Sequence, residues 1–148
     1  MLIATSEAED LAVDLTSIKS HLRIDHDEDD GLLESLTLSA IKHVENKTGW
    51  SLSATDYEWT IEDGDLKRSI PLYPAKVTSG QDLNGGQVSA SIGDTVHFTT
   101  SVSHYKDVLR PAVLLYVQSM YEATADDQAK LESAINAICN SVRRSMGL

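Results

Sequence analysis

The sequence predicts a mainly α-helical fold of the α+β type, a four-helix bundle-like domain with a small β-hairpin or sheet inserted between its second and third helices. Apolar residues recur at helical spacing near both ends of the chain, whereas the middle, about 52–102, shows strand-type alternation and turn residues. The length of 148 residues fits a single domain, 1–148. The helices are expected at about 17–23, 29–48, 107–123 and 128–146.

The first two helices form a unit around an acidic turn. Thr16 is a good N-cap residue for the first helix, in which Ile18 and Leu22 share one face. Gly49 is expected to end the second helix in the left-handed backbone region. The apolar stripe of the second helix, which predicts its buried face, comprises Leu33, Leu36, Ala40, Ile41, Val44 and Thr48. The polar residues expected to face outward or to flank this stripe are Glu34, Ser35, Lys42, Glu45 and Asn46.

The turn between these helices concentrates carboxylates. They belong to Asp25, Asp27, Glu28, Asp29 and Asp30. A calcium-binding EF-hand loop starting at Asp25 requires glycine where Asp30 stands and glutamate where Leu36 stands, so that pattern fails. Capping of the next helix and attraction to its positive end explain the acids more economically than a dedicated cation site. We therefore predict no metal site.

The middle of the chain is predicted to form strands. Tyr57, Trp59 and Ile61 alternate onto one face of the first. Two further strands are expected on either side of a turn at Gly93-Asp94. The glycine-containing segment Asn84-Gly85-Gly86 lacks the lysine and the helix that follow a phosphate-binding loop, so it is read as a turn.

The third and fourth helices carry the remaining candidate contact residues. The third helix is apolar around most of its circumference, which suits either a core helix or one shared with another subunit. Its candidates for core or ring packing are Val113, Tyr116, Val117, Met120 and Tyr121. Arg143 and Arg144 end the fourth helix, where they either complement the helix dipole or form a basic tail that docks on an acidic partner.

Charge and composition limit the function. The net charge is −11, and residues 1–65 hold 16 acidic and 4 basic residues, which argues against tight nucleic-acid binding. The single cysteine, Cys139, excludes an intrachain disulfide and is expected to be a small buried hydrophobe. The sequence contains no signal peptide, no membrane-spanning run and no catalytic or metal-binding motif. We therefore predict a cytosolic protein, not an enzyme, without cofactors.

Several segments, in this order, resemble the head-tail connector (portal adaptor) proteins of long-tailed phages, prophages and gene transfer agents. The resemblance covers roughly residues 13–146. It rests on Leu15-Thr16, Lys19, Leu22-Arg23-Ile24-Asp25, Leu32-Leu33, Ala40, Val44-Glu45, Thr48-Gly49, Trp59, Val96, Phe98-Thr99, Pro111 to Val117 and Met120-Tyr121-Glu122.

The resemblance implies a structural virion protein at the head-tail junction, assembled in the host cytoplasm. Such proteins form a homo-oligomeric ring, commonly of twelve subunits, between the portal protein and the tail or stopper protein, and extend the DNA channel. DNA would pass the acidic turn without specific binding, and Arg143 and Arg144 would dock on the portal. The main alternative is a small cytosolic helical regulatory or interaction module without catalytic activity. An enzyme whose active site has no sequence signature is a third possibility.

Overall fold

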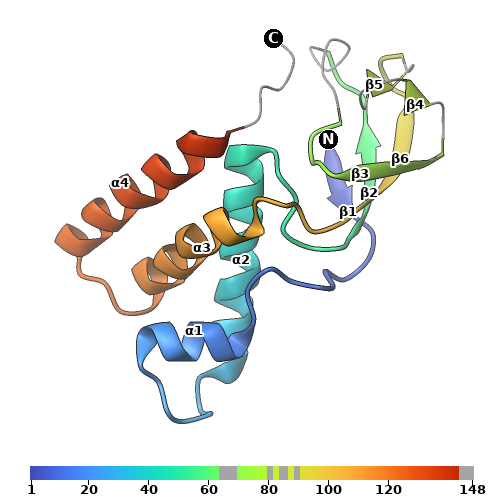
Figure 1. Cartoon of the computed structure of the whole chain (residues 1–148). Coiled ribbons are helices and arrows are strands. Elements are labelled where there is room, and N and C mark those ends of the chain that lie inside the picture. Colours follow the sequence, from blue (N-terminus) through green and yellow to red (C-terminus); the bar gives the residue numbers. More distant parts are fainter. Residues whose placement is uncertain (64–69, 80–81, 84–86, 89–90, 144–148) are drawn as a thin grey trace. The chain divides into compact units, whose positions relative to one another are not determined.

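The computed structural model describes residues 1–63, 70–79, 82–83, 87–88 and 91–143 (Figure 1). In chain order the elements are β1 (Leu2–Ala4), α1 (Leu15–Leu22), α2 (Asp30–Thr48), β2 (Asp56–Thr60), β3 (Ala75–Ser79), β4 (Asp82–Leu83), β5 (Gln87–Val88), β6 (Thr95–Thr100), α3 (Lys106–Tyr121) and α4 (Ala125–Val142). They form two compact units. The sheet unit contains Met1–Leu11 and Gly49–Ser103, and the helical unit contains Ala12–Thr48 and His104–Arg143. The predicted class, four helices with a small antiparallel sheet between the second and third, is confirmed.

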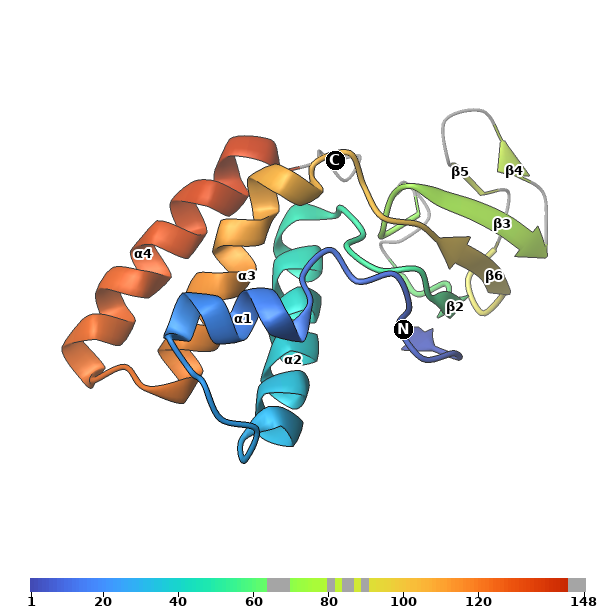
Figure 2. The ribbon, with the colours of Figure 1, turned by 60° about the horizontal axis from the view of Figure 1, so that its bottom comes forward.

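In the helical unit, α3 packs against α2 and α4, and α1 lies across α2 and α3 (Figure 2). The predicted N-cap of α1 was wrong. The helix begins at Leu15, because the carboxylate of Asp14 accepts a 2.8 Å hydrogen bond from the backbone N–H of Ser17. This hydrogen bond lowers the pKa of Asp14. The helix ends at Leu22, and the following residue, Arg23, has the left-handed backbone, with a φ of 59°.

The apolar stripe of α2 is largely confirmed. Leu33, Ala40, Ile41 and Val44 are fully buried, while Leu36 is half-buried. The prediction failed for Glu45, which was expected on or beside the exposed face and is instead fully buried. Gly49 follows α2 with a φ of 76°, which confirms its predicted role as the residue that ends the helix.

The last two helices both start and end earlier than predicted, with α3 ending at Tyr121 instead of residue 123. The side chain of Thr124 caps α4 by accepting a hydrogen bond from the backbone N–H of Asp127, so α4 begins at Ala125 instead of residue 128. Arg143 has a non-helical backbone, which ends α4 at Val142 instead of residue 146. Cys139 is 1% exposed, as predicted, and burial raises the pKa of its thiol.

The sheet unit is built on an antiparallel sheet with the strand order β1-β2-β6-β3. Tyr57 pairs with Phe98, and Trp59 pairs with Val96, so their side chains cover one face. Together with Ile61, Ile70 and Leu72 these four residues form the apolar core of the unit. The buried face predicted from Tyr57, Trp59 and Ile61 is therefore confirmed.

The two strands expected on either side of Gly93-Asp94 are β5 and β6, and they pair with different partners. The strand after this turn, β6, pairs with β2 and β3, whereas β5 pairs with β4. The reason is that Gly93 donates its N–H to the carbonyl of Ile61, and Ile61 donates to the carbonyl of Asp94, which aligns β6 with the end of β2. The turn residues Asn84-Gly85-Gly86 lie outside the described residues.

Candidate assembly surfaces

Lys19 of α1 forms salt bridges with two carboxylates of the acidic turn. Its ammonium group donates hydrogen bonds to the carboxylates of Asp27, at 2.6 Å, and Asp30, at 2.9 Å. The Lys19 side chain is only 17% exposed, whereas that of Asp27 is 89% exposed. The hydrogen bond with Asp27 is the largest cause of a raised pKa of Lys19 and of a lowered pKa of Asp27. Two of the five clustered acids therefore hold the turn against α1.

A third acid ties the turn to α3. The phenol of Tyr121 donates a 2.5 Å hydrogen bond to the carboxylate of Asp29, and this bond raises the pKa of Tyr121. It joins the residue just before α2 to the last residue of α3. Asp29 and Asp30 are half-buried, whereas Asp25, Asp27 and Glu28 are exposed. The carboxylates of Asp25, Asp27 and Glu28 are therefore the ones most exposed to solvent.

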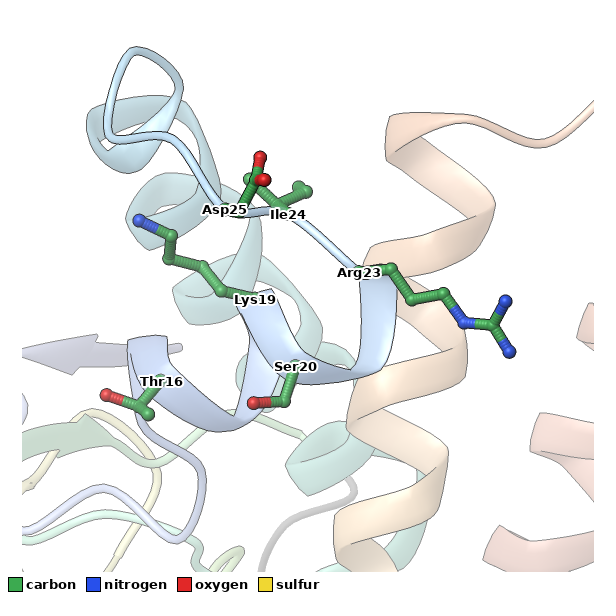
Figure 3. A pocket seen from close by; sticks show the side chains of 6 residues that line it. All are labelled: Thr16, Lys19, Ser20, Arg23, Ile24 and Asp25. Atoms are coloured by element: carbon green, nitrogen blue, oxygen red, sulfur yellow. The ribbon is translucent and has the colours of Figure 1, made fainter.

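A hollow beside α1 brings two cations near the turn without forming an anion site. It is lined by Thr16, Lys19, Ser20, Arg23, Ile24 and Asp25. Figure 3 shows Lys19 reaching toward the turn, while Arg23 points away on the opposite side. The two charges do not converge, and the ammonium of Lys19 is already bound to two carboxylates.

Within the described part of the chain, no three His, Cys, Asp or Glu side chains are grouped so that they could hold a metal ion. Among the same residues, no helix has the length and apolarity needed to cross a membrane.

The five candidate packing residues of α3 differ widely in exposure. Val113 and Val117 are completely buried in the helical unit. Tyr116 is half-buried, with its ring 4.5 Å from that of His43 on α2, whereas Met120 is 55% exposed. The fifth, Tyr121, holds the acidic turn. Within α3, Met120 is therefore the candidate with most surface left for a partner.

A groove between α3 and α4 contains the exposed Met120. It has a volume of about 290 Å³ and is lined by His43, Tyr116, Ser119, Met120, Gln128, Glu132 and Ile135. Ile135 is 2% exposed. Burial is the main cause of a lowered pKa of His43, which favours the neutral imidazole beside Tyr116.

The two terminal arginines are only partly described. Arg143 is exposed and directly follows α4, and Arg144 lies outside the described residues.

Comparison with known proteins identifies the family. The model of the phage gp6-like head-tail connector protein family matches residues 12–141. The chain belongs to this family. Among solved structures, the connector resembles a chain of the virion of a native gene transfer agent particle, with a TM-score of 0.68 and 18% identity. It also resembles a chain from the neck of an empty gene transfer agent particle computed with C6 symmetry, with a TM-score of 0.66 and 17% identity.

Each likeness covers 100% of the connector and 97% of the other chain. At these identities the two structures support the fold. No curated protein sequence matches the chain. Membership of the family makes the chain a structural connector and not an enzyme.

Sequence reasoning missed the contacts that organise the connector's surface. Lys19 was part of the resemblance, but nothing in the sequence linked it to carboxylates 8 and 11 positions later. The pairing of His43 with Tyr116 was also missed, because it depends on how α2 crosses α3. The available signal for such a contact was the position of His43, an amphipathic side chain at the edge of the apolar stripe of α2.

We expect Lys19→Met to destabilise the connector at neutral pH and to make it less sensitive to acid. The lowered pKa of Asp27 means that its contribution is present above the ordinary Asp pKa of about 4 and is lost as pH falls through the lower folded value. The raised pKa of Lys19 means that the stabilisation from its charged ammonium group is fully present below the ordinary Lys pKa of about 10.5. This stabilisation is lost only as pH rises through the higher folded value. Urea unfolding followed by circular dichroism should show a midpoint difference at pH 6 that shrinks below pH 4.

The matched control is Lys130→Met, which removes an exposed lysine from α4. Its urea midpoint should follow that of the unmodified connector at each pH. Equal midpoints for Lys19→Met and the unmodified connector at pH 6 would show that the ion pairs do not stabilise the turn. Because Asp27 is largely solvated, the expected difference is modest.

Proposed function

We propose that this connector forms a homo-oligomeric ring at the head-tail junction of a virion, between the portal protein and the tail or stopper protein. The match of residues 12–141 to the connector family carries the proposal. The likeness to a chain from a particle neck with C6 symmetry supports it, because a ring of twelve subunits is compatible with six-fold symmetry. The proposal treats residues 1–148 as one connector domain, made in the host cytoplasm and incorporated into the particle.

The acidic turn is proposed to face either the DNA channel or a neighbouring subunit. Asp25, Asp27 and Glu28 are exposed within four consecutive positions of the chain. The half-buried Asp29 and Asp30 follow them and add negative charge. A surface of this sign repels the phosphate backbone, so DNA can pass without sticking. The contacts of Lys19 and Tyr121 hold the turn in place, which suits a surface of fixed shape.

The portal is the proposed partner of the basic C-terminal end. Arg143 is exposed beyond the end of α4, where its guanidinium group can bind an acidic surface. Arg144 is assigned to the same surface from the sequence.

The mass of the assembly tests the ring. Light scattering after size exclusion should give about twelve times the chain mass of 16.2 kDa, either for the connector alone or after mixing with its portal protein. Negative-stain images of the same fraction should show closed rings. A stable dimer that does not change when portal is added would contradict the proposal.

A further inference from the structure

Four large apolar side chains are exposed in the described helical unit, Leu32 and Leu38 on α2 and Val108 and Met120 on α3. Met120 at the end of α3 is 55% exposed, and Leu38 on α2 is 42% exposed. An exposed apolar side chain is ordinary when it stands alone on a surface, so each of the two is considered together with the surface around it. A ring formed by head-to-tail contacts requires two different surfaces on each copy, one complementary to the other. The inference that follows rests on the proposed ring.

The groove at Met120 has the properties of a socket. Its volume of about 290 Å³ exceeds the roughly 150 Å³ of a cavity that accepts a benzene-sized apolar group. Its apolar lining comes from Met120, Ile135 and the ring of Tyr116, and Ser119 and Gln128 add polar groups. The socket therefore has room and chemistry for a branched aliphatic side chain.

Leu38 has the properties of a knob. It lies on the exposed side of α2, with Glu34 one turn before it and Lys42 one turn after it. Five residues separate Leu38 from His43, which turns the two side chains about 140° apart around the helix axis. Since His43 lines the socket, Leu38 points away from the socket of its own chain.

The charges beside the knob and the socket are complementary. Glu132 lines the socket, and Lys47 stands one helical turn after His43, with its ammonium group donating a hydrogen bond to Asn136 of α4. The knob carries Glu34 and Lys42, which likewise provide one charge of each sign. The ammonium group of Lys42 lies 3.2 Å from the carboxylate of Glu45, and the Lys42 side chain is 37% exposed.

We infer that Leu38 of one copy docks into the groove at Met120 of the next copy, with Glu34 and Lys42 of the first facing Lys47 and Glu132 of the second. A second copy of this chain is thus the occupant of the groove. The contact is heterologous, because the knob surface and the socket surface differ. Repeated around an axis it closes a ring.

Cysteine cross-linking tests this contact directly. Leu38→Cys and Met120→Cys are prepared as single variants and treated with bis-maleimidoethane, separately and as an equimolar mixture, at the concentration at which rings form or with portal present. On a denaturing gel the mixture should give one cross-linked heterodimer, and each single variant treated alone should give only the uncross-linked chain. The double variant should give a ladder of oligomers. Cys139 should remain unreactive, because it is 1% exposed and its thiol pKa is raised.

A matched control is Val108→Cys, which places a thiol at another exposed apolar position of α3. Mixed with Leu38→Cys it should give no dimer above background. Strong self-cross-linking of either single variant would overturn the inference, since it indicates a two-fold contact. Rings in which positions 38 and 120 do not cross-link would also overturn it and leave the ring proposal standing. The absence of both rings and cross-links would reject the two together.

A second measurement separates a second copy from another occupant. Leu38→Asp and Met120→Asp should each prevent ring formation while leaving the circular dichroism spectrum unchanged, because both side chains are exposed. Mixing the two variants restores one intact contact and should give a dimer by light scattering. If Met120→Asp instead abolishes portal binding but leaves rings intact, the groove belongs to the portal and the inference is wrong.

Discussion

Phe98→Ala is expected to lower the free energy of unfolding of the sheet unit by about 3–5 kcal/mol. Phe98 is 1% exposed and its ring stacks on that of Tyr57, with 5.3 Å between the ring centroids. It also sits on β6, the strand that pairs with both β2 and β3. A loss of this size is a large part of the roughly 5–15 kcal/mol that stabilises a typical domain.

Tryptophan fluorescence during urea unfolding provides the measurement. Trp50 and Trp59 both belong to the sheet unit, and Trp59 is 3% exposed, so the signal reports this unit. The conservative control is Phe98→Leu, which keeps most of the apolar volume and should cost clearly less. If Phe98→Ala and Phe98→Leu unfold at the same urea concentration, the ring of Phe98 does not hold the sheet core together.

The helices of the connector could be predicted because their signals are local. Leu33, Ala40 and Val44 recur at helical spacing, and burial follows that spacing directly. The end of α2 at Gly49 was equally readable. The start of α1 was harder to predict, because Asp14 and Thr16 are both favourable N-cap residues. Which of them caps the helix depends on which side chain reaches a free backbone N–H.

The sheet and the candidate site depend on contacts between distant parts of the chain. The N-terminal strand β1 pairs with β2 more than fifty residues later, and alternation within β1 is too short to reveal it. The socket likewise joins His43 to residues of α3 and α4. Such contacts depend on how the helices cross, and the spacing of apolar residues does not encode a crossing angle.

Glu45 shows why a charge pattern alone misplaces a residue. Its charge placed it on or beside the exposed face of α2, although it stands beside Val44 and one turn after Ile41, both of which are buried. The structure buries Glu45 completely and brings the ammonium of Lys42 to 3.2 Å from its carboxylate. A buried carboxylate is tolerated when hydrogen bonds and an opposite charge replace water.

Glu45→Ala is therefore expected to destabilise the helical unit by about 2–3 kcal/mol. Removing one member of a fully buried ion pair costs roughly 3–5 kcal/mol, because the other charge is left in a nonpolar environment. Here Lys42 is 37% exposed and can turn toward water, which lowers the expected cost. Urea unfolding followed by circular dichroism at 222 nm gives the measurement. The exposed Glu34→Ala on the same helix should stay within about 0.5 kcal/mol of the unmodified connector, and an equally small effect of Glu45→Ala would mean that its burial contributes nothing to stability.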